Sequence, residues 1–284
     1  SYVWLGQVQS DRYELDDAIT NLKKAIELNS DCYQANNILM GHHIAAGYQV
    51  MLPEEKRDVE LGMKYGDELI RIRGDHGYPY HFKANVYRQL GEFEKAKPLY
   101  EKSIQKRKGL SSEATAYLVS GHNFMFSGDL KIARERYAKA TELTKTANSW
   151  FFLNQYLTYS YIFDNDYIEA IDNISSVEKQ LDERGFDEIT LLERRGNASW
   201  QKMICYAHNQ MEEDAYNALE QGSAFSEKRA KLLNDENTWR SVRSDRLFET
   251  AWVNVLFGKY EEAKKNLAKL KEMQEKRNDP TAMY

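Results

Sequence analysis

The chain has 284 residues, 42% of them hydrophobic and 12% aromatic, and a formal net charge of −5 at pH 7. This charge argues against a general nucleic-acid-binding surface, because phosphate binding needs a basic face. Four prolines and 15 glycines are too few for a loop-rich or low-complexity chain, and no apolar run approaches the ~18–20 residues of a membrane span. We therefore expect an ordered chain with neither a nucleic-acid nor a membrane partner.

The two cysteines, Cys32 and Cys205, are far apart in the sequence. They provide neither the spacing of a metal site nor a disulfide framework. No phosphate-binding glycine motif, metalloprotease motif or nucleophile elbow is present, and no signal peptide is visible. We therefore expect a cytoplasmic protein that is not an enzyme and needs no metal or cofactor.

A helical pattern begins at the N-terminus. Leu5-Gly6 lies in the first predicted helix, and Arg12-Tyr13 lies in the turn that follows. In the second helix a small residue is followed at steps of four and three by side chains on the same helical face, namely Ala18, Leu22 and Ala25. Small residues on the facing sides of two helices let the helix axes approach closely. The first repeat is therefore predicted to be a helix, a turn and a second helix.

The second repeat is irregular. Its first helix is predicted through Ile38 and Ile44, and its second from Gly62 to Ile72, with an extended connection from Gly47 to Glu55. Gly62 and Gly66 stand where the other repeats have an alanine and an aromatic residue. Each glycine inside a helix costs about 1 kcal/mol relative to alanine. Because contacts in a solenoid join nearest neighbours, the region of the long connection around Gly47 to Gly66 is expected to be a soft joint.

The third repeat, from Tyr80 to Ile104, shows the pattern most clearly. Ala84 and Ala96 flank the turn at Gly91-Glu92, and Tyr100 is expected to fill the space beside their contact. Four further repeats follow with similar spacing, at Gly121–Ala140, Thr158–Val177, Met203–Gly222 and Ala251–Leu270. The match is weakest in the sixth repeat.

Seven such repeats account for nearly the whole chain, which favours one repeat array over two globular domains. Each repeat is predicted to contain helices of roughly 12–18 residues and no strand. Neither end shows the polar capping helix that repeat arrays normally need, so we expect this chain to be a segment of a longer protein. The approximate boundaries of the seven repeats in a single solenoid are 1–32, 33–76, 77–110, 114–147, 150–184, 190–233 and 238–277.

The repeated unit resembles the tetratricopeptide repeat, a helix-turn-helix of about 34 residues. The resemblance rests on Leu-Gly early in the unit, Gly-x-Tyr/Phe at the turn and Ala-x3-Tyr-x2-Ala after it. The clearest carriers are Gly91-Glu92-Phe93 with Ala96 and Tyr100, and Gly128-Asp129-Leu130 with Ala133, Tyr137 and Ala140. The signature tryptophan and the closing proline of the family are mostly absent. The resemblance implies an all-α, right-handed superhelical solenoid of about seven antiparallel helix pairs.

In such a superhelix the first helix of each pair lines the concave surface. Residues just before and just after the small residue of each first helix are then expected to face a groove. Such a surface of aromatic and amide side chains suits the capture of a peptide or helix. The candidate partner-binding residues are Trp4, His81, Phe82, Asn85, His122, Tyr156, Tyr159, Trp200, Gln201, Phe248 and Trp252, with Glu249 beside them.

The sequence therefore predicts a scaffold that binds a peptide or helical segment of another protein along its concave groove. The alternative is a ligand- or peptide-sensing regulatory module of a larger signalling or transcription-regulating protein. A third, weaker hypothesis is an enzyme that uses Asp75, His76 and His81 around a turn, where these side chains could meet a metal. Some family members hold a C-terminal carboxylate with two lysines, two asparagines and an arginine. Here only Asn85 and Arg88 are in place, so we expect no such clamp.

Overall fold

The computed structural model describes residues 1–44 and 51–278, and within them the chain forms fourteen α-helices, two short 3₁₀ helices and no strand. None of these helices is both long enough and apolar enough to cross a membrane. Contacts divide the chain into two compact units, Ser1–Thr144 (unit 1) and Lys145–Tyr284 (unit 2).

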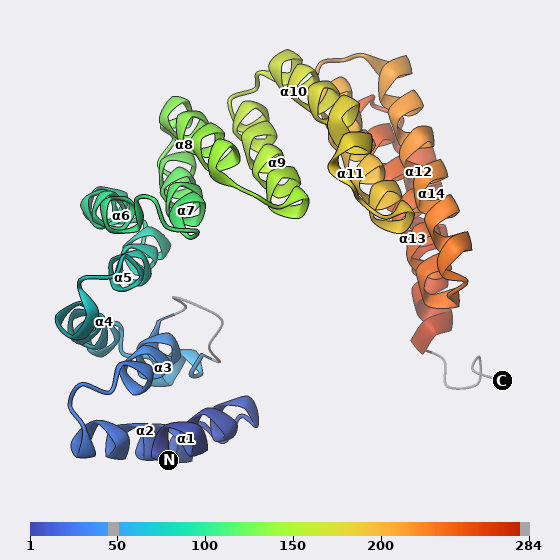
Figure 1. The fold of residues 1–284 in the computed structure, drawn as a ribbon. Coiled ribbons are helices and arrows are strands. Elements are labelled where there is room, and N and C mark those ends of the chain that lie inside the picture. The colour runs from blue at the N-terminus through green and yellow to red at the C-terminus, as the bar shows by residue number, and fades with distance from the viewer. Residues whose placement is uncertain (45–50, 279–284) are drawn as a thin grey trace. The chain divides into compact units, whose positions relative to one another are not determined.

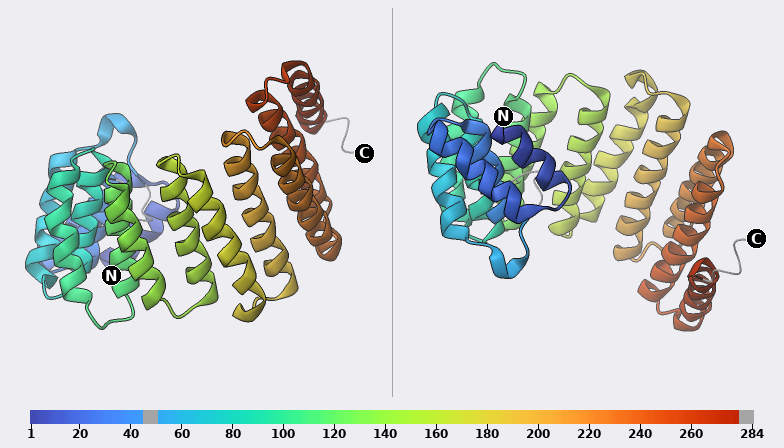
Figure 2. Two further views of the ribbon diagram at one scale, coloured as in Figure 1. Left: turned by 90° about the horizontal axis from the view of Figure 1, so that it is seen from above. Right: turned by 90° about the horizontal axis from the view of Figure 1, so that it is seen from below.

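Within each unit, consecutive helices pack in antiparallel pairs, which we call hairpins 1 to 7 (Figures 1 and 2). The predicted all-α repeat fold of about seven helix pairs is thereby confirmed. Unit 1 contains α1 (Tyr2–Asp11), α2 (Leu15–Leu28), α3 (Tyr33–His43), α4 (Val59–Arg73), α5 (Tyr78–Gln89), α6 (Phe93–Arg107), α7 (Glu113–Phe126) and α8 (Leu130–Leu143). Unit 2 contains α9 (Ala147–Phe163), α10 (Tyr167–Gln180), α11 (Glu188–His208), α12 (Glu212–Leu233), α13 (Glu236–Leu256) and α14 (Tyr260–Asn278).

The small residues allow the two helices of a hairpin to pack closely. In hairpin 3, Ala84 and Ala96 are fully buried and form a cluster with Tyr100. In hairpin 4, the ring of Tyr137 packs so closely on Gly121 that a Cβ at this glycine would lie 2.6 Å from the ring. The predicted packing of Ala84 with Ala96 and Tyr100 is therefore present in hairpin 3, and Tyr137 takes the equivalent place beside Gly121 in hairpin 4.

Six of the hairpins turn in the same way. One residue in each turn has a positive φ, between 59° and 85°, and the next amide donates a hydrogen bond of 2.8–2.9 Å to the carbonyl five residues earlier. This Schellman geometry closes the end of the first helix and favours glycine. The six residues are Tyr13, Gly91, Gly128, Asn165, Gln210 and Gly258.

Tyr13 and Gln210 adopt the left-handed conformation at a steric cost, because a Cβ crowds the following carbonyl there. The Tyr13 side chain is 76% exposed, so its removal should sacrifice little packing. We expect Tyr13→Gly and Gln210→Gly each to raise the free energy of unfolding by about 1 kcal/mol. Thermal unfolding followed by circular dichroism measures the change. Gly258→Ala, at the equivalent position of hairpin 7, should have the opposite sign, and a stabilising Gly258→Ala would contradict this account.

Hairpin 2 departs from the regular pattern. Ile44 is not helical as predicted but lies just after α3 in an extended conformation. A Cβ at Gly62 would lie only 2.7 Å from the Ile44 side chain, so the glycine allows the chain leaving α3 to pack on α4. The predicted extended connection falls partly outside the described residues, and its end forms a 3₁₀ turn at Glu54–Lys56.

The helices vary more in length than the sequence predicts. They range from 10 residues in α1 to 22 in α12, and all four helices from α11 to α14 have 19 or more. No proline interrupts α11 to α13, and polar residues continue their helical pattern beyond the repeat signature. These long helices provide extra surface at hairpin 6, where α11 and α12 continue beyond the Met203–Ala215 contact.

Candidate functional site

Two of the predicted groove residues in unit 1, Asn85 and His122, form hydrogen bonds with the second helix of their own hairpin. The Tyr100 hydroxyl donates a hydrogen bond of 2.7 Å to Asn85 Oδ1, and the Tyr137 hydroxyl lies 2.8 Å from His122 Nδ1. Burial, with a smaller contribution from Arg88, lowers the pKa of His122 to about 4, so the imidazole is neutral at pH 7. Both residues therefore join the two helices of a hairpin.

His81 lies below the surface. It is 8% exposed, and its Nδ1 accepts a hydrogen bond of 3.0 Å from the guanidinium of the buried Arg107. Burial, and then the charge of Arg107, lower the pKa of His81 to about 3, which keeps the ring neutral. Phe82 packs against this ring with centroids 5.4 Å apart. The position of His81 does not match the prediction that its side chain faces an open groove.

The suggested metal corner does not assemble. His76 pairs with Asp75 and Arg73, whereas His81 faces Arg107. Among residues 1–44 and 51–278, no group of three or more histidine, cysteine or carboxylate side chains is arranged to hold a metal ion. The enzyme hypothesis for this corner therefore has no structural support.

Trp4 is the most exposed of the predicted groove residues, at 68%. It borders a shallow hollow of ≈ 170 Å³ between α1 and α3. The hollow is lined by Val3, Trp4, Gln7, Tyr33, Gln34, Asn37 and Ile38. Its lining of apolar surface with three amides is typical of a surface that receives a peptide side chain.

In unit 2 the predicted residues have diverse environments. Gln201 is 3% exposed and therefore lies outside any open surface. Tyr156 and Tyr159 are half-buried and meet edge to face at 6.5 Å. Trp252 packs against His208 at the edge of a buried cluster, whereas Phe248 is 55% exposed. Trp200 and the neighbouring candidate Glu249 both border a larger cavity.

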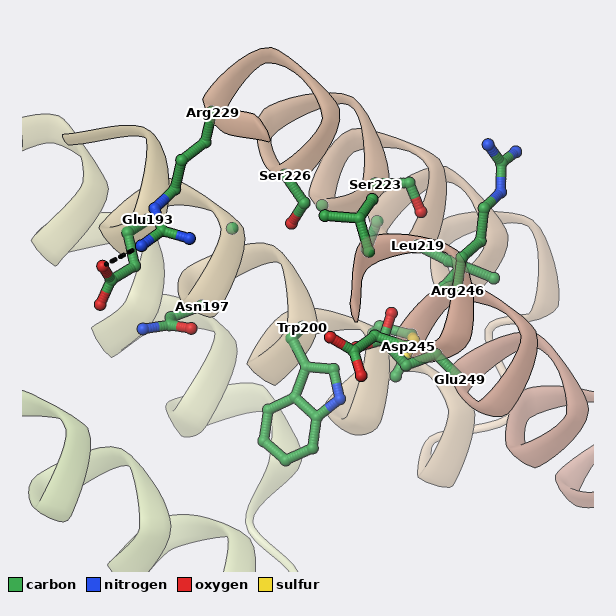
Figure 3. Close-up of a pocket in the computed structure, with 15 residues that line it drawn as sticks. Glu193, Asn197, Trp200, Leu219, Ser223, Ser226, Arg229, Asp245, Arg246 and Glu249 are labelled. Atoms are coloured by element: carbon green, nitrogen blue, oxygen red, sulfur yellow. Dashed lines mark ion pairs between the residues drawn. The ribbon is translucent and has the colours of Figure 1, made fainter. Parts of the chain in front are cut away.

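A larger cavity of ≈ 350 Å³ lies between α11, α12 and α13, and we call it the α11–α13 pocket (Figure 3). Two of its lining residues are glycines, at which α11 and α12 approach each other: a Cβ at Gly222 would lie 3.7 Å from the carbonyl of Gly196. The absence of side chains at this crossing leaves space beside it. The lining residues are Glu193, Gly196, Asn197, Trp200, Met203, Ala218, Leu219, Gly222, Ser223, Ser226, Arg229, Val242, Asp245, Arg246 and Glu249.

The charged groups of the pocket are divided between its two ends. At one end Arg229 lies 3.3 Å from Glu193, while Trp200, Asp245 and Glu249 lie together at the other (Figure 3). Arg246, the remaining cation, pairs with Glu220 and Glu227. Within the described part of the chain, neither Asp245 nor Glu249 has an ion pair. The tryptophan end of the pocket therefore carries uncompensated acid groups.

Burial and, to a lesser extent, the nearby Asp245 raise the pKa of Glu249 to about 7. The protonated carboxyl is then favoured in the folded state. The contribution of Glu249 to stability is accordingly greatest below its ordinary pKa and is lost as the pH rises through about 7. A carboxyl group that titrates near neutral pH in a cavity is a common mark of a functional site.

Removing this charge should stabilise the protein at alkaline pH. We expect Glu249→Gln to raise the free energy of unfolding at about pH 8 by roughly 1–2 kcal/mol more than at about pH 4, after allowance for partial solvent exposure. Thermal unfolding at the two pH values measures the difference. Glu213→Gln, at an exposed position of α12 outside the pocket, is the matched control. Equal effects of Glu249→Gln at both pH values would contradict the raised pKa.

Counting from the repeat pattern identifies Trp200 and Glu249 but misses Asp245, Asn197 and Ser223. Asp245 and Glu249 are four residues apart, and so are Gly196 and Trp200, which places each pair on one helical face. This four-residue spacing is the sequence signal that could have identified Asp245 as a site residue. The sequence does not show that these faces of α11 and α13 meet, because their meeting depends on the lengths and crossing of α11, α12 and α13.

Residues 78–105 match the model of the tetratricopeptide repeat family. A comparison with curated proteins finds no match. Among solved structures, aspartyl phosphate phosphatase F from Bacillus subtilis is 14% identical with a TM-score of 0.58, covering 99% of this chain and 76% of that one.

Two further solved structures share the fold. BtubC (BKLC) from P. vanneervenii is 13% identical with a TM-score of 0.55, covering 90% of this chain and 92% of that one. A Podospora anserina protein with nearly identical TPR-like repeats is 18% identical with a TM-score of 0.52, covering 73% and 97%. The resemblance noted in the sequence is thereby confirmed.

Proposed function

We propose that this tetratricopeptide repeat protein is an interaction scaffold that binds an extended or helical segment of a partner protein. The observation that carries the proposal is Trp200, a 38% exposed indole at the border of the α11–α13 pocket. Large aromatic side chains beside a cavity are the usual anchors of protein interfaces. The hollow beside Trp4 in unit 1 offers a second anchor of the same kind.

Each unit has its own candidate binding surface, made of aromatic residues that are half-buried or exposed. In unit 1 these are Trp4 and Phe82, and in unit 2 they are Tyr156, Tyr159, Trp200, Phe248 and Trp252. Asn85 and His122 support this surface by joining their hairpins. His81 and Gln201 are left out because they are buried. No catalytic role is assigned to any of them.

The second candidate is a sensor module that closes round a small ligand or a short signalling peptide. The size of the α11–α13 pocket favours it, since cavities of about 300–1,000 Å³ commonly hold small ligands. A neighbour that shares the fold at 14% identity is described as an aspartyl phosphate phosphatase, which is compatible with this alternative. Both candidates use the same pocket but differ in the length of chain they bind.

A selection from random peptides tests the proposal. The full 284-residue chain is immobilised, and phage displaying random peptides of about twelve residues are selected on it, a length that can cross more than one hairpin. We expect families of related peptides that bind with one-to-one stoichiometry and lose affinity when truncated from either end. Retention of full affinity by fragments of two or three residues would favour the sensor, and failure to select any peptide would contradict the scaffold.

A further inference from the structure

We propose that the α11–α13 pocket receives the guanidinium group of an arginine in the bound segment, stacked on the indole of Trp200 and paired with Asp245 and Glu249. This inference rests on the proposed function and names the chemistry of one of its anchors. It follows from three independent features of the pocket, namely its charge, its aromatic wall and its unsatisfied polar lining.

The charge of the pocket calls for a cation. Its lining contains the acids Glu193, Asp245 and Glu249 and the bases Arg229 and Arg246. Arg229 and Arg246 already pair with carboxylates. Asp245 and Glu249, beside Trp200, have no basic partner among the described residues. The Ser241 hydroxyl donates a hydrogen bond of 3.1 Å to Asp245 Oδ2. A bound cation would supply the charge that the pocket lacks.

The aromatic wall favours a guanidinium over an ammonium. A flat guanidinium stacks on an aromatic face while its edge donates hydrogen bonds, which the compact lysine head does less well. The protein uses this arrangement elsewhere, since the Arg184 guanidinium lies 3.9 Å from the ring centre of Trp150, and Arg107 lies 3.9 Å from that of Tyr78. Trp200 has no such cation over its ring among the described residues, and it lines the pocket with 38% of its surface exposed.

The polar lining supplies acceptors for several donors. Ser223 lines the pocket, is only 5% exposed, and its Oγ has no hydrogen-bond partner in the structure. A buried hydroxyl without a partner is unfavourable unless a ligand or water satisfies it. Asn197 and Ser226 add further oxygen atoms. A guanidinium carries five N–H donors, so it can satisfy several of these groups at once.

Binding should depend on pH because a cation prefers the ionised form of Glu249. The groups that face Glu249 across the pocket are Glu193 on α11 and Arg229 on α12, with Asp245 and Arg246 on its own helix. Arg229 pairs with Glu193, and Arg246 pairs with Glu220 and Glu227. The pKa of Glu249 is raised to about 7, so its charge changes across the neutral range. Affinity for a cation should therefore rise with pH through about 7.

The test uses N-acetyl-arginine methylamide as the probe, with the full chain, and follows the indole N–H signal of Trp200 by nuclear magnetic resonance. The Trp200→Phe variant assigns this signal. We expect a saturable shift at millimolar probe, and an affinity about tenfold higher at about pH 8 than at about pH 6. Glu249→Gln should abolish the pH dependence and Asp245→Asn should weaken binding about tenfold. Glu213→Gln should change neither.

Two matched probes test whether the bound group must be a guanidinium. The citrulline analogue has the same shape without the charge, and the lysine analogue has the charge without the planar head. Equal binding of citrulline, or no shift with up to about 50 mM of the arginine probe, would overturn the proposal. Tighter binding of the lysine analogue would overturn the guanidinium assignment. If selected peptides bind without any enrichment in arginine, this inference fails while the scaffold stands. If the probe binds but no peptide is selected, the scaffold fails, and only the affinity of the pocket for a guanidinium group remains.

Discussion

Trp200→Ala should weaken the binding of a selected peptide by about thirtyfold or more, because aromatic anchors beside interface cavities typically contribute 2 kcal/mol or more. The indole is 38% exposed and borders the pocket rather than filling the core between α11 and α12. Its removal should therefore change the melting temperature little. Fluorescence anisotropy with a labelled peptide measures the affinity, and circular dichroism measures the melting temperature of the same protein.

Tyr156→Ala is expected to act in the same direction, from the surface of α9. Lys179→Ala on α10 and Lys231→Ala on α12 serve as controls, because exposed charges on second helices should contribute little to binding. The opposite result for Trp200→Ala, a lower melting temperature with unchanged affinity, would mean that its indole is part of the packing and that the binding surface lies elsewhere.

Gly121→Ala should lower the free energy of unfolding by about 1–3 kcal/mol, although alanine is the better helix former. The added methyl group would lie 2.6 Å from the ring of Tyr137, which is fully buried and whose hydroxyl is held by His122. The ring cannot withdraw without breaking that hydrogen bond and separating α7 from α8. Thermal unfolding and amide exchange in hairpin 4 should both show the loss.

Gly196→Ala provides the matched control in the middle of another helix. The nearest atom to its added Cβ is Ser226 Oγ at 3.6 Å, which is an ordinary contact distance. The gain in helix propensity should then prevail and stabilise the protein by up to about 1 kcal/mol. A Gly121→Ala protein that is as stable as Gly196→Ala would show that the Tyr137 ring is not tightly confined, and would refute the proposed packing.

The hairpins could be predicted from the sequence because their signals are local. A small residue, a turn and a second small residue twelve positions later lie within one segment, and neighbouring helices in the chain are neighbours in space. The lengths of the helices were less predictable. In α12 the residues after Gly222 carry no repeat signature, yet the helix continues to Leu233 and helps to form the pocket.

The candidate site was predictable only in part, because burial depends on residues that the repeat pattern does not count. His81 is covered by Arg107, which comes 26 residues later and on the next helix. Asn85 is engaged by Tyr100 for a similar reason. Trp200 and Glu249 fall at predicted positions, but their meeting with Asp245 requires the crossing of α11 and α12 at Gly196 and Gly222.

The shared geometry of the turns also bears on how the chain acquires its structure. Each closing hydrogen bond joins residues only five positions apart, as from the Glu92 amide to the Tyr87 carbonyl. Such short loops close at small entropic expense, and local contacts of this kind favour rapid folding. During synthesis a hairpin can therefore pair as soon as its second helix has left the ribosome. Lasting burial of its outer face must wait for the next hairpin, so the order of the sequence becomes the order of assembly.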